Sequence, residues 1–287
     1  MTEAILFAFA SAILLGAGVV TAQFGLRTVE PSSGASISVP SFTLLFLLLA
    51  PLILSGEPVV WWGLPVFAAI GLIFPALLTL LTFASNRALG PVVTSTLGNL
   101  APVFAVALAI ALLHEPLQAR QLAGLTIAVA GAVIITVTRP RDFGSWRSWA
   151  LLLPLGSAVL RGVIPPIVKL GLEIWPSPLW ACLIGYIMSS LVVLSVQRIR
   201  KGSFLAEAPM SGRLWFAVTG ICNGLSALTL FAAVHNGPIT LVAPIVAIYP
   251  LVTVLLSAIM LRHVKVTPRI AAGTCLAVAG VALVLIG

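Results

Sequence analysis

The sequence predicts an all-α polytopic membrane protein, with ten transmembrane helices arranged as two inverted five-helix repeats. Three observations support this prediction. Of the 287 residues, 60% are hydrophobic and only 8% are charged, whereas a soluble domain carries about 25% charged residues. The apolar residues fall into long runs separated by short connections, and the first half of the chain recurs in the second.

The composition leaves too little polar surface to cover a water-soluble globule, so the lipid bilayer is the expected surrounding. A pI near 10.5 would suggest nucleic acid in a soluble protein, but here the basic residues lie in gaps between apolar runs. We therefore expect them to set membrane orientation, with no nucleic-acid partner. The three cysteines, an odd number without CxxC spacing, fall inside apolar runs and predict neither disulfides nor metal ligands.

A membrane-spanning helix needs roughly 20 apolar residues, and helix is favoured over strand because the apolar runs are long and do not alternate. Ten runs meet this length, at about 4–24, 36–55, 62–84, 91–113, 121–138, 148–170, 178–197, 214–234, 239–261 and 269–286. The longest connection, around 198–213, has no room for a soluble domain. Any function is therefore expected within the membrane.

The basic residues predict the orientation of the helices. Connections after odd-numbered helices hold twelve of the fifteen, namely Arg27, Arg87, Arg139, Arg141, Arg147, Arg198, Arg200, Lys201, Arg213, Arg262, Lys265 and Arg269. Connections after even-numbered helices hold only Arg120 and Lys169, and Arg161 lies inside a run. By the positive-inside rule, both termini are predicted to be extracytoplasmic, in the cytoplasmic (inner) membrane.

An internal repeat relates the two halves of the chain. Residues 11–26 and 157–172 share six of sixteen residues at a shift of 146, and Pro102 recurs as Pro250. The predicted units, 1–143 and 144–287, each contain five helices. An odd number gives the second unit the opposite orientation, as in secondary transporters whose site lies near the midplane between the halves.

Several motifs resemble those of the drug/metabolite transporter superfamily, in its ten-helix branch built from two EamA-type units. They are Leu15-Gly16 with Gln23, Ala88-Leu89-Gly90-Pro91, Leu113-His114-Glu115-Pro116-Leu117, and Gln121 with Gly124. The resemblance covers essentially the whole chain. It implies the inverted-repeat fold and a transporter, in a branch that includes exporters of amino acids and varied metabolites.

The chain departs from that family at three places. The family often has Trp before the glycine of helices 1 and 6, where this chain has Leu15 and Arg161. The second unit has Leu261-Arg262-His263-Val264 where a Gly-Glu-Pro-like turn is expected.

Arg161 is the one charge deep inside an apolar run. An arginine at that depth costs at least about 3 kcal/mol on insertion scales, so it should face a wet or paired environment. One reading is that Arg161 binds a substrate carboxylate bidentately. The alternative is a tie to backbone carbonyls that Pro165 and Pro166 leave without a donor. Lys169 lies near a helix end and is expected to reach the membrane interface.

Polar residues at helical spacing mark three further faces. Asn99 shares a face with Ser95, Asn223 with Ser226, and Tyr249 with Thr253. Such groups can hold helices together or line a polar cavity. The predicted substrate-binding residues are Arg161, Asn99, Asn223, Tyr249, Ser95 and Ser226.

Small residues predict close helix packing rather than a site. Gly124, Ala128 and Gly131 form a stripe that recurs in the second repeat, and we expect it to pack helices 4 and 5 against helices 9 and 10. No histidines have metal-ligand spacing, and no catalytic set can be argued. We therefore predict no enzyme activity, no metal and no cofactor.

The predicted function is a secondary transporter, expected to be an exporter, of small polar metabolites such as amino acids or related carboxylate-bearing compounds, by alternating access. The expected partners are a small-molecule substrate and the bilayer, with the chain as a monomer or homodimer. Two alternatives are a non-transporting membrane scaffold or assembly protein, and a membrane-embedded enzyme. The enzyme is disfavoured because the predicted spans hold no Asp or Glu and no clustered His.

Overall fold

A computed structural model describes residues 1–136, 148–204, 206–261 and 268–286, and within them the regular structure is entirely helical. The helices of the first half are α1 (Thr2–Gly25), α2 (Pro31–Ile53), α3 (Leu64–Ile73), α4 (Ala76–Gly98), α5 (Ala101–Leu113) and α6 (Ala119–Thr136). Those of the second half are α7 (Leu152–Ile174), α8 (Pro178–Lys201), α9 (Met210–Asn236), α10 (Ile239–Val246), α11 (Tyr249–Leu261) and α12 (Pro268–Ile286). Short 3-10 turns, Trp61–Gly63 and Ser148–Leu151, precede α3 and α7.

The prediction of an all-helical membrane protein is confirmed. Seven described helical stretches are long and apolar enough to cross a bilayer, and three shorter apolar helices accompany them. Seven of the ten predicted spans correspond to single helices, α1, α2, α6, α7, α8, α9 and α12. The predicted connection at 85–90 is wrong, because α4 continues through it as helix.

The other three predicted spans are interrupted, each beside a proline. The breaks fall at Phe74–Pro75, at Asn99–Leu100 before Pro102, and at Ala247–Ile248 before Pro250. Proline has no N–H to donate to the carbonyl four residues earlier, so the helix loses a hydrogen bond there. The last two breaks occupy equivalent positions in the two repeats.

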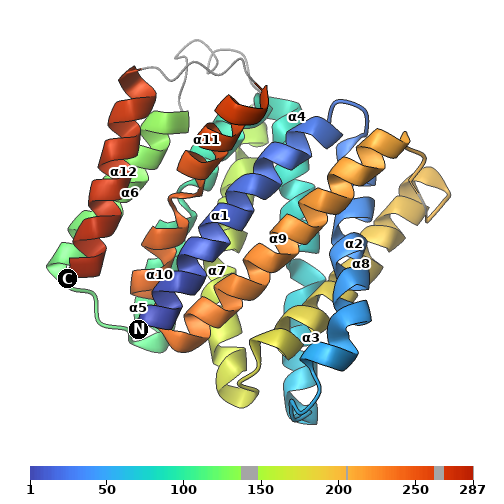
Figure 1. Ribbon diagram of the computed structural model, residues 1–287, viewed down its shortest axis with the longest axis horizontal. Coiled ribbons are helices and arrows are strands. Elements are labelled where there is room, and N and C mark those ends of the chain that lie inside the picture. Colours follow the sequence, from blue (N-terminus) through green and yellow to red (C-terminus); the bar gives the residue numbers. More distant parts are fainter. Residues whose placement is uncertain (137–147, 205, 262–267, 287) are drawn as a thin grey trace.

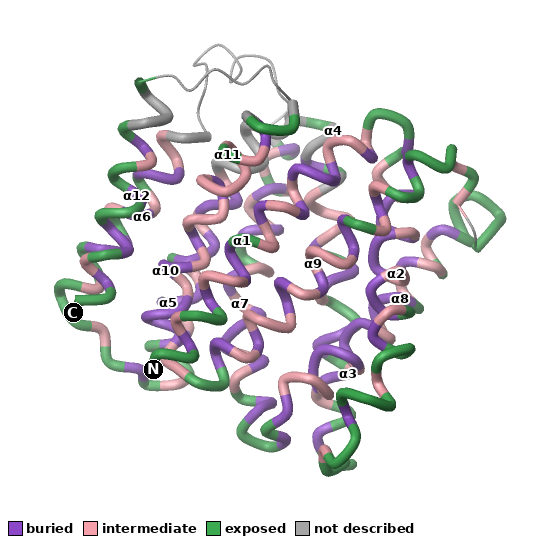
Figure 2. The backbone as a smooth tube through the Cα atoms, in the orientation of Figure 1, coloured by how far each residue is buried: buried purple, intermediate pink, exposed green. Residues whose placement is uncertain are grey.

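Helices of one repeat pack mainly against helices of the other, with α1 along α9 and α7 along α4 and α5. Figure 1 shows α1 and α9 side by side, with α6 and α12 at one edge of the bundle and α2 and α8 towards the other. The two termini lie near the same end of the bundle. Figure 2 shows buried residues along the helices in the middle of the bundle and exposed residues at its ends.

Equivalent glycines make equivalent contacts in the two repeats. A Cβ atom at Gly16 would lie 2.9 Å from the Tyr249 carbonyl oxygen and 2.7 Å from the Val252 Cβ. A Cβ atom at Gly162 would lie 2.6 Å from the Ala101 carbonyl oxygen, and Phe104 is equally close. Only glycine allows these approaches of helix to helix, so the repeated glycines place α1 on α11 and α7 on α5.

The small-residue stripe packs α6 against α12. A Cβ atom at Gly124 would lie 2.6 Å from the Gly280 carbonyl oxygen, and a Cβ atom at Gly280 would lie 2.6 Å from that of Gly124. Ala128 and Ala277 are both buried. The prediction of close packing is confirmed for the fifth and tenth helices of the sequence, which approach nearly backbone to backbone.

Candidate functional site

Arg161 lies near the middle of α7 (Leu152–Ile174) and is half-buried. The helix continues through Pro165 and Pro166. Among the residues that the structure describes, the Arg161 side chain makes no hydrogen bond and no ion pair. The tie to proline-freed carbonyls is therefore not observed, and the guanidinium retains its donors.

Gly162, next to Arg161 on α7, packs on the start of α5, directly after the first repeat's helix break. Tyr249 lies at the corresponding break of the second repeat. It begins α11, directly after the break that ends α10. The Tyr249 hydroxyl oxygen lies 3.9 Å from the position that a Cβ atom would occupy on Gly98, the last residue of α4. Asn99, in the break after α4, is 2% exposed. The middle of α7 and the two helix breaks therefore converge, one from each repeat.

The two breaks supply backbone groups as well as side chains. Pro102 and Pro250 cannot donate hydrogen bonds to the carbonyls of Gly98 and Val246. The ends of helix segments also carry partial charges, negative at carboxyl ends and positive at amino ends. Interrupted helices of this kind form the midplane sites of many transporters. The arrangement can therefore bind a small molecule with groups of both charges.

Two predicted site residues lie between α1 and α9 (Met210–Asn236). Asn223 is half-buried and packs directly on Gly18. Ser226 donates to the Ser11 carbonyl oxygen at 2.9 Å, and Ser11 donates to the Ser226 carbonyl oxygen at the same distance. These reciprocal bonds engage the Ser226 hydroxyl in helix packing. A role of Asn223 or Ser226 in substrate binding stays a prediction.

The remaining predicted site residue is Ser95, and its side chain lies outside the described part of the structure.

Metal binding finds no support among the described residues, which contain no group of three or more His, Cys, Asp or Glu side chains that could hold a metal ion.

From its position in the sequence, Lys169 is expected to reach the membrane interface. In the structure it instead forms an ion pair with a buried carboxylate. Its ammonium nitrogen lies 2.7 Å from Oε1 of Glu115 and donates to the Gly237 carbonyl oxygen at 2.9 Å. Glu115 is only 9% exposed, so a buried carboxylate replaces water as the partner of this cation. The sequence did hold a signal: Glu115 follows the fourth predicted span and Lys169 lies at the end of the sixth, so both are expected on the same side of the membrane.

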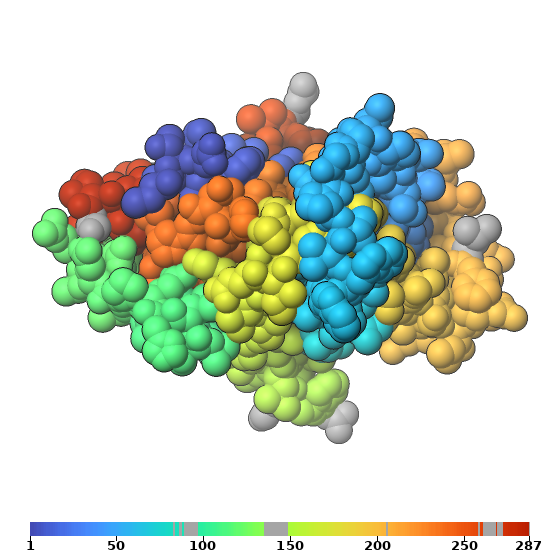
Figure 3. Space-filling model, turned by 90° about the horizontal axis from the view of Figure 1, so that it is seen from below, coloured from blue at the N-terminus to red at the C-terminus, as the bar shows by residue number. Residues whose placement is uncertain are grey.

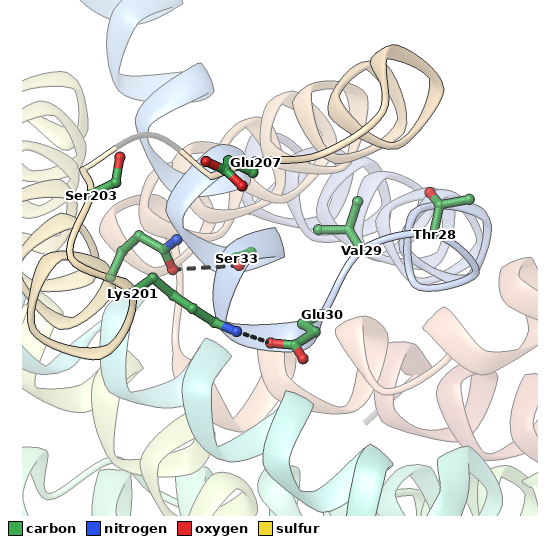
Figure 4. Close-up of a pocket in the computed structure, with 8 residues that line it drawn as sticks. Thr28, Val29, Glu30, Ser33, Lys201, Ser203 and Glu207 are labelled. Carbon is green, nitrogen blue, oxygen red and sulfur yellow. Dashed lines mark hydrogen bonds and ion pairs between the residues drawn. The ribbon is translucent and has the colours of Figure 1, made fainter.

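A separate polar pocket lies at the opposite end of the bundle, between the α1–α2 connection and the end of α8. Its volume is about 280 Å³, and it is lined by Thr28, Val29, Glu30, Ser33, Gln197, Lys201, Ser203 and Glu207. Figure 4 shows Lys201 directed toward Glu30 across one side of it, and their ion pair measures 2.8 Å.

Broken helices that meet between two repeats, inside an otherwise apolar bundle, are the architecture of a polytopic membrane transporter. The chain belongs to the EamA-like transporter family, which it matches in two halves, over residues 2–137 and 148–286. It is thus a membrane transporter of small molecules and not an enzyme.

A solved crystal structure, described only as a protein, has a similar fold with a TM-score of 0.83 at 18% identity, covering 100% of this chain and 97% of its own. At that identity the likeness supports the fold alone. A comparison with curated proteins gives no match.

Proposed function

We propose that this transporter exports a small polar metabolite that bears a carboxylate, such as an amino acid, by alternating access across the cytoplasmic membrane. One observation supports the proposal above all others. Arg161 lies at mid-helix, next to the glycine that packs on the start of α5, without a hydrogen bond or an ion pair to any residue that the structure describes.

The energetics favour an anionic partner for Arg161. An arginine at the centre of a spanning helix costs at least about 3 kcal/mol on insertion scales unless water or a counter-charge reaches it. A carboxylate can accept two parallel hydrogen bonds from the guanidinium, which fixes the orientation of the substrate as well as adding affinity. A cavity with one fixed positive charge also concentrates anionic groups from solution.

The helix breaks favour a substrate that also carries an ammonium group. The carbonyls of Gly98 and Val246 lack the donors that Pro102 and Pro250 cannot provide, and an ammonium group has three N–H donors for such acceptors. An amino acid presents both groups within a few bonds. Asn99 and the Tyr249 hydroxyl could then bind its remaining polar atoms.

Uptake of radiolabelled amino-acid mixtures into proteoliposomes tests this proposal directly. Arg161→Leu should abolish uptake without unfolding the protein, because an apolar residue is favourable in a spanning helix. Arg161→Lys keeps the charge but loses the planar fork, so it should weaken transport partially. Arg120→Leu removes an exposed charge of the same sign and is the matched control. Normal transport by Arg161→Leu, or its unfolding, would refute the role of Arg161 as a substrate anchor.

The proposal includes a direction for the chain in the membrane. The twelve-to-two distribution of basic residues supports an extracytoplasmic location for both termini. The Glu115–Lys169 pair would then lie near the outer surface, and the pocket around Glu30 near the cytoplasm.

A further inference from the structure

A buried ionic network joins three segments of the chain at the end of the bundle where the termini lie. Glu115, in the connection between α5 and α6, accepts the Lys169 ammonium through Oε1 at 2.7 Å. Its two carboxylate oxygens also accept the backbone N–H groups of Ile239 and Thr240, both at 3.0 Å. Those two residues begin α10, so Glu115 caps this helix while it pairs with α7.

The network is strong because its charges reinforce one another. A carboxylate at a helix amino terminus interacts favourably with the unpaired N–H groups and with the positive end of the helix dipole. Charge-assisted bonds are roughly twice as strong as neutral ones. Removing one partner from such a buried set leaves the remaining groups without compensation. Release of α10 from Glu115 must therefore be a distinct, unfavourable step.

The same end of the bundle is closed by tight packing. Six of the eight residues of α10 are buried, Ile239, Thr240, Leu241, Val242, Pro244 and Ile245. Gly237, just before α10, packs on Ala4 of α1, where a Cβ atom would lie 2.6 Å from the Ala4 Cβ. Figure 3 views the molecule from below and shows the start of α1, the end of α9 and the end of α7 as adjoining blue, orange and yellow surfaces. In α11, by contrast, most described residues are half-exposed.

Two short helical segments connect this network to the candidate site. The eight residues of α10 span about 12 Å, and Tyr249 follows three residues after their end. On α7, Arg161 and Lys169 are also eight residues apart, again about 12 Å along the helix. Glu115 therefore bonds at once to a helix that carries Arg161 and to the half-helix that leads to Tyr249.

We propose that Glu115 and Lys169 form a latch that holds the half-helix α10 closed over one end of the transport path. Opening of the latch frees α10 from the α5–α6 connection and gives access to the Arg161–Tyr249 site from that end. The inference rests on the alternating access of the proposed function. It does not depend on the identity of the substrate.

The test measures the accessibility of a single cysteine at position 240. Thr240 is 1% exposed, and its hydroxyl has no hydrogen-bond partner among the described residues, so Thr240→Cys removes no side-chain bond. Cys182, Cys222 and Cys275 are first replaced by alanine. The full-length protein in proteoliposomes is then treated with a membrane-impermeant maleimide, and the labelling rate is followed by mass spectrometry.

We expect Glu115→Ala and Lys169→Met each to accelerate labelling about ten-fold or more, because each removes a buried charge-assisted bond that holds the closed state. The matched control is Glu30→Ala, which breaks the 2.8 Å Lys201–Glu30 pair at the other end, where the side chains are 46% and 54% exposed. That variant should label at the unmodified rate. Unchanged labelling in the latch variants, or equal acceleration in Glu30→Ala, would overturn the proposal.

Two further variants separate the parts of the latch. Lys169→Met leaves the capping carboxylate in place, so it still reports on the ion pair if Glu115→Ala fails to fold. The exchange Glu115→Lys with Lys169→Glu restores opposite charges but sets a lysine against the amino terminus of α10. It should remain fast in labelling, and recovery of slow labelling would refute the capping role. Faster labelling of the latch variants, in a protein that takes up no amino acid, would support the latch and reject the proposed substrate. Amino-acid uptake with unchanged labelling of the latch variants would support the substrate and reject the latch.

Discussion

Ser189 bridges the break between α3 and α4, and its replacement should destabilise the protein strongly. Its hydroxyl donates to the Gly71 carbonyl oxygen at 2.5 Å and accepts the Ala76 N–H at 3.2 Å. The Gly71 carbonyl would bond to residue 75 in a continuous helix, but Pro75 has no N–H. Ser189, on α8 in the second repeat, is fully buried. It therefore supplies hydrogen bonds that the interrupted helix cannot make for itself.

The magnitude of the effect follows from these partners. Polar contacts between membrane helices contribute about 0.6 kcal/mol on average, because the separated groups find other partners. The two backbone groups beside Pro75 have no such alternative, and each buried group left unsatisfied costs about 1–3 kcal/mol. Ser189→Ala should therefore lower the free energy of unfolding by about 2–4 kcal/mol, after some relaxation of the break.

Tryptophan fluorescence during unfolding in mild detergent provides the assay. Ser41→Ala is the matched control, since the Ser41 hydroxyl bonds to the Ile37 carbonyl oxygen in its own helix at 2.7 Å. That carbonyl keeps its backbone partner when the hydroxyl is removed, so the loss should stay below about 1 kcal/mol. If Ser189→Ala proves no more destabilising than Ser41→Ala, the bridging role is refuted.

Three other predictions concern packing, topology and coupling. Gly280→Val should lower the melting temperature, because the added side chain would separate α6 from α12. Gly185→Ala should be tolerated, because its Cβ would lie 4.0 Å from the nearest atom, the Gly71 Cα. Equal effects of the two variants on the melting temperature would contradict the packing argument. A C-terminal phosphatase fusion should be active and a fluorescent-protein fusion dark, and the reverse pair would reverse the orientation. An imposed pH step should not drive substrate accumulation, because the predicted spans hold no acidic residue.

Hydrophobicity alone predicts most of the helices, but not where they break. The runs 91–113 and 239–261 are apolar throughout, and hydropathy does not distinguish a straight helix from two segments. The presence of proline does not predict a helix break either. The helix α7 continues through Pro165 and Pro166, whereas helices end beside Pro75 and Pro250. Whether a helix breaks depends on the neighbours that satisfy the freed backbone groups. At Pro75 that neighbour is Ser189, which belongs to the other repeat.

Helical spacing identifies polar faces but not what those faces contact. Asn223 and Ser226 share a face by sequence, and the structure directs that face at α1. Arg161 and Tyr249 are 88 positions apart, and they are related only through the break between α4 and α5, because α7 packs on α5 at Gly162 and the Tyr249 hydroxyl lies by Gly98. Sequence position places Glu115 and Lys169 on the same side of the membrane, but it does not show that residues 54 positions apart form a pair. Pairing across the bundle depends on tertiary packing.

The unequal residues of the two repeats explain how a nearly symmetric fold can orient a substrate. Gly16 and Gly162 make equivalent contacts, so the packing of the two halves is shared. Beside them, Leu15 stands opposite Arg161 in the repeat alignment. A symmetric site would bind a substrate equally well in two poses related by the pseudo-two-fold axis. In the proposed function, one arginine removes that degeneracy, because the substrate carboxylate then has a single favourable direction and the bound molecule takes one defined orientation.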